Sequence, residues 1–123
     1  MEEQELKERF RQYSIRIVRM VDSIPTKRIA ALAIAKQVIR SGTSPAANYR
    51  AACVAKSKRD FLNKLKMVEE ELDETRYWLE LMVDTDIFPK EKLDALIQET
   101  IELLNIIVKS IVSTRYYLSQ HPE

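Results

Sequence analysis

The chain contains a single glycine, Gly42, among its 123 residues. Sheets and β-hairpins use glycine in tight turns, whereas glycine weakens the interior of a helix, so its near-absence favours long helices. Hydrophobic residues make up 46% of the chain and charged residues 32%, which is typical of a globular protein. A chain of this length fits one domain, and we therefore expect a single all-α domain over residues 1–123.

Several features bear on where such a chain resides. The longest apolar run, Ile29–Ala35, is far shorter than the about 20 residues of a transmembrane helix. Residues 1–9 lack the apolar stretch of a signal peptide. Cys53 is the only cysteine, so no disulfide can form within the chain. These features predict a cytoplasmic protein without membrane contact.

Apolar residues recur at helical spacing from the first residues onward. The first stretch carries Leu6, Phe10, Tyr13, Ile17, Met20 and Ile24. Pro25 is expected to end this helix, because proline disfavours the helical conformation of the residue before it. We expect a second helix to run from a cap at Thr26 to Ser41, with Gly42 as its left-handed terminator.

The third helix is expected to begin with Ser44 as its cap and Pro45 at its first position, where the missing N–H costs nothing. Ser57 is a second capping signal, at which this helix could pause. Beyond Ser57 a heptad-like apolar rhythm continues to Val83.

Residues 84–86 are expected to form a turn, and Pro89 to start a fourth helix that ends near Ser119. Four helices with short connections predict an antiparallel up-and-down four-helix bundle. The first and fourth helices carry more apolar residues than one buried stripe requires, namely Ile15, Val18, Val21, Leu96, Ile101, Leu103, Ile106 and Val112. Contiguous exposed apolar surface usually marks an interface, so we expect a homo-oligomer; a broad core with scattered surface aliphatics is the alternative.

Charge is segregated along the chain although the net charge is only +1. Residues 27–66 hold ten basic side chains and one acidic side chain, whereas residues 67–102 hold twelve acidic and three basic ones. Basic clusters on helices can neutralise phosphates. Alternatively, the two segments could pair with each other inside the bundle or between subunits.

We expect RNA or DNA contacts from the basic segment, with Tyr49 stacking on an unpaired base. The expected contact residues are Arg40, Asn48, Tyr49, Arg50, Lys56, Lys58, Arg59 and Lys64. The alternative is a protein-interaction scaffold or accessory subunit, which docks a partner enzyme and does not contact nucleic acid. A pI near 7.8 is lower than that of most dedicated nucleic-acid-binding domains.

Two arrangements could support catalysis. Carboxylates within residues 70–74 lie one turn apart, as in magnesium-binding helical pyrophosphatases, and Glu99 and Glu102 would have to supply the second cluster. Arg115 and His121 have a spacing similar to that of HEPN-type ribonucleases. A solvated acidic face and a frayed terminus explain these residues more simply, so we expect a non-catalytic protein without a metal or other cofactor.

Three motifs resemble those of a bacterial family called four helix bundle proteins, or ribosomal RNA intervening-sequence-encoded proteins. These motifs are Arg40–Asn48 (Arg-Ser-Gly-Thr-Ser-Pro-Ala-Ala-Asn), Ser57–Phe61 (Ser-Lys-Arg-Asp-Phe) and Glu74–Leu81 (Glu-Thr-Arg-Tyr-Trp-Leu-Glu-Leu). The resemblance implies four up-and-down helices, a ring-shaped homopentamer and a suspected nucleic-acid role. Family members usually have Glu where this chain has Ala51, so any role of that carboxylate is missing here or is filled differently.

Overall fold

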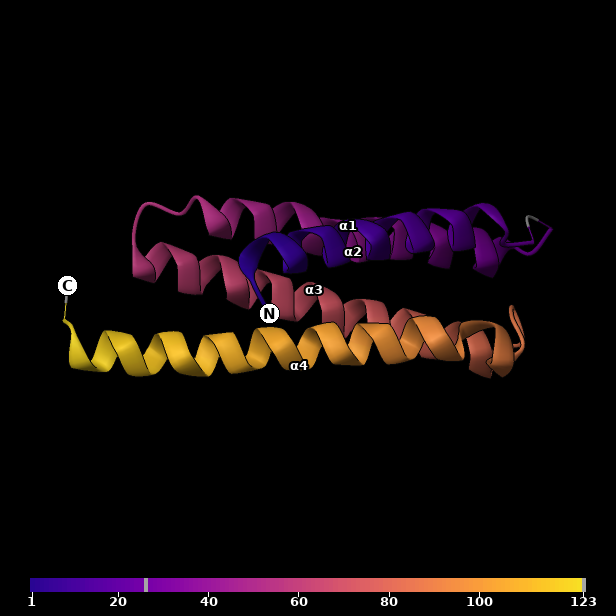
Figure 1. The fold of residues 1–123 in the computed structure, drawn as a ribbon. Helices are drawn as coiled ribbons and strands as arrows, with labels where there is room; N and C mark the ends of the chain where they lie inside the picture. Colours follow the sequence, from indigo (N-terminus) through magenta and orange to yellow (C-terminus); the bar gives the residue numbers. More distant parts are fainter. Residues whose placement is uncertain (26, 123) are drawn as a thin grey trace.

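The computed structural model describes residues 1–25 and 27–122, which form four antiparallel helices (Figure 1). Helix α1 spans Glu3–Asp22, α2 spans Ile29–Cys53, α3 spans Lys58–Asp84 and α4 spans Lys90–Gln120. Helices that follow one another in the chain pack side by side, whereas α1 and α4 approach each other much less closely. This architecture confirms the expected all-α bundle. Within the described ranges, no helix is long and apolar enough to span a bilayer.

The boundary between the second and third helices differs from the one expected. Helix α2 continues through Gly42, Ser44 and Pro45 without a break, and it ends only at Cys53. The break lies at residues 54–57, where Ser57 caps α3 by accepting a hydrogen bond of 3.0 Å from the Asp60 amide. Thr26, the expected cap of the second helix, lies outside the described residues.

Gly42 serves helix packing rather than helix termination. It is buried, its φ is not positive, and a Cβ built on it would stand 2.8 Å from Ile17 Cγ2 of α1. Pro45 removes one backbone donor inside α2, and the hydroxyls next to it bond to carbonyls one turn earlier, Thr43 to Ile39 at 2.6 Å and Ser44 to Arg40 at 2.7 Å. The local cap pattern at residues 42–45 was therefore misleading.

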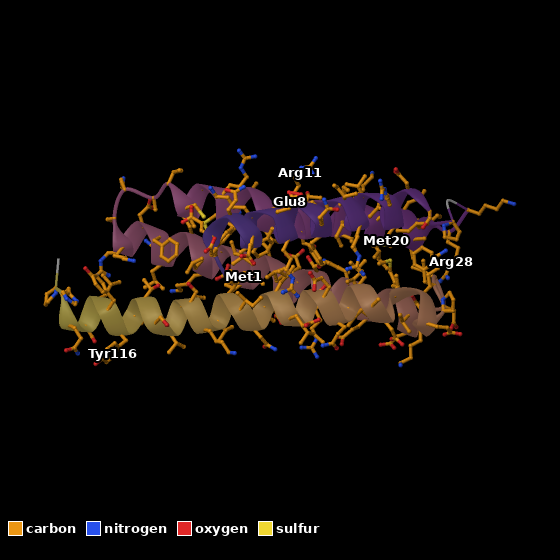
Figure 2. All side chains as sticks on the ribbon, in the orientation of Figure 1. Met1, Glu8, Arg11, Met20, Arg28 and Tyr116 are labelled. Atoms are coloured by element: carbon orange, nitrogen blue, oxygen red, sulfur yellow. The ribbon has the colours of Figure 1, made fainter. Side chains whose placement is uncertain are left out.

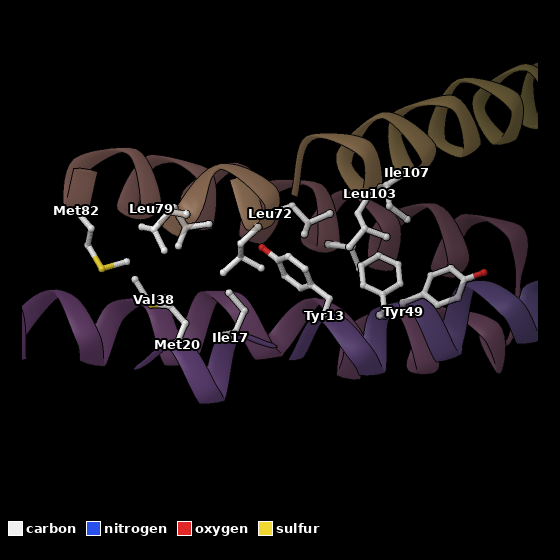
Figure 3. Packing of buried hydrophobic residues seen from close by; sticks show 14 of the residues in the cluster. Tyr13, Ile17, Met20, Val38, Tyr49, Leu72, Leu79, Met82, Leu103 and Ile107 are labelled. Atoms are coloured by element: carbon white, nitrogen blue, oxygen red, sulfur yellow. The ribbon is translucent and has the colours of Figure 1, made fainter. Parts of the chain in front are cut away.

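The core follows the expected stripes on α1 and α3 and a shifted one on α4 (Figure 3). Every apolar residue expected in the α1 stripe is buried. On α4, Leu96 and Leu103, which were counted beyond one buried stripe, are buried, whereas Ile97 and Leu104 are only partly buried. The apolar residues of α4 cover two adjacent stripes, and tertiary packing selects between them.

Three buried threonines lie among these apolar residues without unsatisfied hydroxyls. Thr75, Thr100 and Thr114 each bond to the carbonyl four residues earlier, at 2.8, 2.8 and 2.7 Å. Thr100 also links α4 to α1, because its Oγ1 lies 2.6 Å from the hydroxyl of Tyr13. Since Thr100 gives its own proton to the Leu96 carbonyl, Tyr13 is the donor in this pair.

Helix α4 is longer than its neighbours. Its 31 residues span about 46 Å, whereas the 20 residues of α1 span about 30 Å. Tyr13 of α1 meets Thr100 of α4 in an antiparallel arrangement, so the last turns of α4 extend past the start of α1 (Figure 1). Those last turns pack on the beginning of α3 without cover from α1.

Candidate nucleic-acid interface

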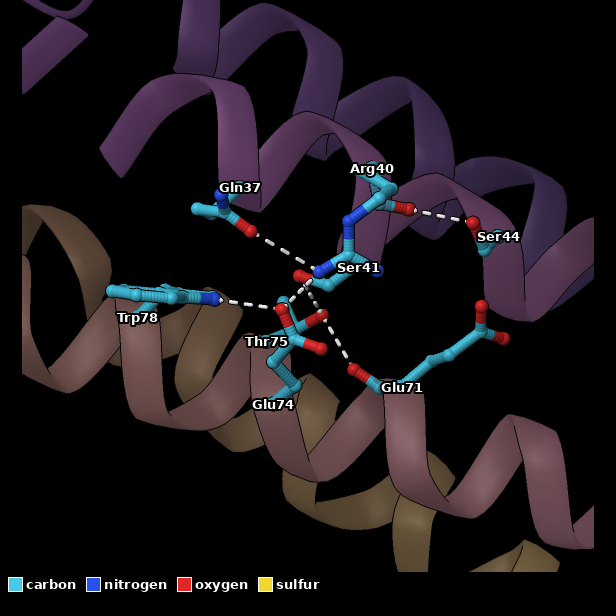
Figure 4. Close-up of polar contacts among 8 residues, drawn as sticks. All are labelled: Gln37, Arg40, Ser41, Ser44, Glu71, Glu74, Thr75 and Trp78. Carbon is cyan, nitrogen blue, oxygen red and sulfur yellow. Dashed lines mark hydrogen bonds and ion pairs between the residues drawn. The ribbon is translucent and has the colours of Figure 1, made fainter. Parts of the chain in front are cut away.

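Arg40 lies on the side of α2 that faces α3 (Figure 4). Its guanidinium forms an ion pair with Glu74 and donates to Gln37 Oε1 at 3.2 Å. The same Glu74 carboxylate accepts a hydrogen bond of 3.0 Å from the indole N–H of Trp78. Arg40 is therefore engaged by the acidic segment of α3 and connects two helices.

Asn48 has a similar position two turns further along α2. Its side-chain amide donates to Glu71 Oε1 of α3 at 2.9 Å. Between these two contacts, Ser41 Oγ and Thr75 Oγ1 form a buried hydrogen bond of 2.9 Å. The polar residues of the Arg40–Asn48 motif thus join α2 to α3, and both Arg40, whose side chain is 52% exposed, and Asn48 are paired with carboxylates of α3.

Tyr49 belongs to the core. Its side chain is only 7% exposed, and its ring stacks on Phe10 of α1 with 5.2 Å between centroids. Stacking of Tyr49 on an unpaired base does not fit this position. The apolar environment favours the neutral phenol, so burial raises the pKa of Tyr49.

The remaining expected residues lie near the turn between α2 and α3. Lys56, Lys58 and Arg59 are exposed there, and the Lys58 ammonium lies 5.5 Å from the Phe61 ring centroid. Lys64 is half-buried and bonds to Asp60 one turn earlier at 3.3 Å. Glu3 of α1 lines the same recess as Lys56 and Lys58, so one carboxylate is close to this group.

Helix α4 contributes two further cations, which lie outside the basic segment of residues 27–66. The Lys58 ammonium lies 5.3 Å from the Tyr117 ring centroid, which shows that the start of α3 packs beside the end of α4. Lys109 and Arg115 lie on this part of α4 and are exposed. Residues 103–122 contain no acidic residue, and this was the sequence signal that could have identified them. We call Lys56, Lys58, Arg59, Lys64, Lys66, Lys109 and Arg115 the basic end.

Arg50 lies apart from the basic end, on the side of α2 that faces α1. It lines a groove between these helices with a volume of about 520 Å³, together with Lys7 and Arg11 of α1. Apart from Tyr49, which lies in the core, the expected site residues therefore fall into three groups. Arg40 and Asn48 face α3, Arg50 faces α1, and the four lysine and arginine residues from 56 to 64 lie at the basic end.

Pairing between the basic and acidic segments is local. Among ion pairs within the described ranges, Arg40–Glu74 is the only one that joins residues 27–66 to residues 67–102. Arg28 also reaches the acidic segment, but it bonds to the carbonyl of Thr85 at 3.1 Å. The basic segment is therefore largely free of internal carboxylate partners.

The carboxylates considered for a magnesium site face different partners. Glu71 accepts from Asn48, Glu74 pairs with Arg40, and Glu99 receives two hydrogen bonds from Arg9, at 2.8 and 2.6 Å. The bond to Glu99 raises the pKa of Arg9. In the part of the chain that is described, no three potential metal ligands come together.

His121 is exposed at the end of α4. Its ring stacks on Tyr117 with 4.1 Å between centroids, and its Nδ1 lies 3.0 Å from the Tyr117 carbonyl oxygen. Cys53 is half-buried at the end of α2, and burial raises the pKa of its thiol. A raised pKa lowers the thiolate fraction at neutral pH, and the thiolate is the reactive form.

Comparison with known proteins places the chain in a family. The model of a family described as 23S rRNA-intervening sequence protein matches residues 2–109. Among solved structures, the chain is similar to a protein of unknown function from the S23 ribosomal protein family of Bacteroides thetaiotaomicron VPI-5482. The two are 31% identical with a TM-score of 0.79, and the match covers 86% of this chain and 97% of that one. No curated protein matches. The chain belongs to the 23S rRNA-intervening sequence protein family.

Proposed function

We propose that the chain is a non-catalytic, self-associating protein whose basic end binds the backbone of RNA or DNA. One observation carries this proposal: the start of α3 packs beside the end of α4, with Lys58 5.3 Å from the Tyr117 ring centroid. This packing brings Lys109 and Arg115 to the same end of the bundle as the cations of residues 56–66. The basic end holds seven cations drawn from two helices and the turn between α2 and α3.

Carboxylates near the basic end are few. Asp60 is the only acidic residue in residues 56–66, and Lys64 already binds it. Lysine and arginine side chains that lack strong internal partners can release counterions from a nucleic acid and gain affinity by doing so. This term does not depend on base sequence, so it supports backbone binding rather than base readout.

Aromatic side chains accompany these cations. Tyr116 is 69% exposed and Tyr117 is 42% exposed, both on the last turns of α4. Exposed aromatic rings beside a positively charged surface can stack on unpaired bases. Tyr117 therefore replaces Tyr49 in the stacking role that we assign to this surface, whereas Tyr116 belongs to the apolar row described next.

Self-association is supported by an apolar row on α4. Val108, Val112 and Tyr116 follow one another at intervals of four residues, and they are 37%, 60% and 69% exposed. Residues four apart share one helix face, so these side chains form a continuous exposed strip. A second copy of the chain that covers this strip would remove it from water. The family resemblance further suggests a homopentamer.

The test measures binding of a single-stranded RNA with a 5′-hydroxyl as a function of salt. Replacement of Lys58 and Arg59 by alanine should make the dependence of log K on log salt shallower by about 1.4, because each lost phosphate contact removes about 0.7. Lys90→Ala/Lys92→Ala removes two cations at the opposite end of α4 and serves as the matched control. Equal effects of both double variants, or no binding at about 50 mM salt, would contradict the proposal.

The alternative function is a protein scaffold, and the strip of Val108, Val112 and Tyr116 also favours it, because such a strip can dock a partner protein. A charge-reversed variant, Lys58→Glu/Arg59→Glu, separates the two functions. Loss of RNA binding with unchanged assembly supports the nucleic-acid function. The scaffold is supported if the charge-reversed variant still co-purifies with the same protein partner from native cells and the wild type co-purifies with no RNA.

A further inference from the structure

The groove between α1 and α2 lies on a different part of the molecule from the basic end. Its volume is about 520 Å³, and Thr43, Ala46 and Ala47 of α2 line it together with residues of α1. These short side chains leave the space open. Glu8 and Arg11, which also line the groove, point to the side of the bundle opposite Tyr116 (Figure 2).

Three cations from two helices line this groove. Lys7 and Arg11 lie one turn apart on α1, and Arg50 comes from α2. Glu8 is the only carboxylate in the lining, and it is shared between Gln12, at 3.1 Å, and Arg11, at 3.5 Å. The groove therefore has an excess of positive charge.

The internal partners of these cations are weak. Lys7 lies 3.5 Å from Glu3, which is 60% exposed, and Arg11 lies 3.5 Å from Glu8, with both side chains of the second pair largely exposed; each pair lies within one helix turn. Surface pairs of this kind contribute little to stability. A bound anion can therefore replace Glu3 and Glu8 as the partner of these cations at a small cost in free energy. Among the ion pairs of the described ranges, none involves Arg50.

Ser14 provides an independent indication of a ligand. Its hydroxyl oxygen is fully buried and has no hydrogen-bond partner, and Ser14 lines the groove. Buried hydroxyls almost always have a partner, because leaving one unpaired is costly. A rotation about the χ1 bond of Ser14 would turn this hydroxyl to a ligand oxygen in the groove.

We propose that the α1–α2 groove binds a phosphate group, held by Lys7, Arg11 and Arg50 and hydrogen-bonded by Ser14. Guanidinium groups bind phosphate through paired N–H donors, and lysine adds a point charge. The phosphate can be a free anion or the terminal phosphate of a nucleic acid. This phosphate site is separate from the basic end. Of the residues expected to contact nucleic acid, only Arg50 lines the groove.

The first experiment titrates the full chain with inorganic phosphate at constant ionic strength, set with chloride, and follows binding by calorimetry. Ala47→Glu places a carboxylate in the groove and should weaken phosphate binding by about tenfold or more. Ala47→Gln has the same length without the charge and should bind within about threefold of the wild type. Ala47 is exposed on α2, and Glu and Gln are both good helix formers, so neither replacement should disturb the helix.

Ser14→Ala distinguishes a ligand contact from a purely structural residue. Removal of an unpaired buried hydroxyl should leave the melting temperature without ligand unchanged or higher. The same variant should weaken phosphate binding several-fold, because the ligand loses a hydrogen bond. A structural role alone would lower the melting temperature and leave phosphate affinity as in the wild type.

Arg19→Ala is the control for general charge effects. Arg19 lies on α1 but lines a separate groove with Arg16 and Lys92, where the Ser23 hydroxyl already donates to the Met20 carbonyl at 2.7 Å. Arg11→Ala should weaken phosphate binding, and Arg19→Ala should not. Equal effects of Arg11→Ala and Arg19→Ala, full binding by Ala47→Glu, or no saturable binding in either arm would overturn the proposal.

The second arm identifies the source of the phosphate with an RNA oligonucleotide that carries either a 5′-phosphate or a 5′-hydroxyl. A gain in affinity from the 5′-phosphate that disappears in Ala47→Glu assigns the groove to a nucleic-acid end. Binding of inorganic phosphate without such a gain assigns it to a free anion. The titration with inorganic phosphate does not depend on Lys58 and Arg59, so failure of this site and failure of the proposed function can be told apart.

Discussion

Gly42 of α2 lies so close to Ile17 of α1 that an added Cβ would stand 2.8 Å from Ile17 Cγ2 and 2.9 Å from Cγ1. Real Cβ atoms do not approach neighbours this closely. Ile17 is completely buried, and its branched side chain has little freedom at χ1, so it cannot easily move aside. Gly42 therefore sets the distance between the two helices that enclose the α1–α2 groove.

Gly42→Ala should lower the free energy of unfolding by up to about 2 kcal/mol, because overpacking costs about 1–3 kcal/mol and the gain in helix propensity offsets about 1 kcal/mol of it. Urea unfolding measures the change. The matched double variant, Gly42→Ala/Ile17→Ala, removes the clashing atoms, so it should be less destabilised than the sum of the two single variants. Strict additivity would show that the two residues do not press on each other.

Tyr13 should make the stability of the bundle fall at alkaline pH. Burial raises the pKa of its phenol above the ordinary value of 10.0, so the folded chain keeps a proton that the unfolded chain loses. The unfolded state therefore binds fewer protons above pH 10, and the free energy of unfolding decreases as pH rises through that range.

Tyr13→Phe should cost about 0.5–1.5 kcal/mol at neutral pH, because Thr100 loses a hydrogen-bond donor. Between pH 10 and 11 its stability should decline less steeply than that of the wild type. Urea titrations at a series of pH values measure both slopes. Parallel slopes would indicate that Tyr13 ionises equally in both states.

Arg40 should support the fold more than nucleic-acid binding. Because its guanidinium pairs with Glu74 on a partly exposed surface, the double-mutant coupling of Arg40→Ala with Glu74→Ala should be about 0.2–1 kcal/mol. The salt dependence of RNA binding should remain unchanged in Arg40→Ala. If Arg40→Ala reduced the salt dependence of RNA binding as much as Lys58→Ala does, Arg40 would contact the nucleic acid. That result would contradict its assignment to the fold.

Val112→Asp should weaken self-association without unfolding the chain, because Val112 is 60% exposed in the centre of the apolar strip on α4. Burial of an unpaired carboxylate at an interface is unfavourable. Ser113→Asp introduces the same charge at the neighbouring exposed position, outside the strip, and should retain the wild-type mass. Sedimentation equilibrium measures the mass of the assembly that each variant forms. Equal masses for the two variants would show that the strip is not part of the interface.

Periodicity alone identified the α1 core from Leu6 to Ile24, because its apolar residues form one continuous stripe, whereas Ile15, Val18 and Val21 lie only in the second half of the helix. It was less informative for α4, where Leu96 and Ile97 are equally apolar neighbours. Which of the two faces inward depends on the rotation of α4 against α3, and no local pattern contains that rotation. For the same reason, Thr100 and Thr114 were not recognised as core positions.

The candidate site shows a similar division. The sequence predicted a basic region at residues 56–64, since these charges are close along the chain. It did not predict that Arg40 and Asn48 would contact Glu74 and Glu71, because such pairs depend on the register between two helices. The contribution of Lys109 and Arg115 likewise depends on how far α4 extends past α1.

Local chemistry in the sequence determined the helical class, the bundle and the excess of cations in residues 27–66. Tertiary packing decided that Gly42 brings two helices together instead of ending one, and that Arg50 joins Lys7 and Arg11 in a groove. The physical reason is common to both. Helical periodicity and capping act over a few residues, whereas contacts between helices depend on distances that only the folded chain defines.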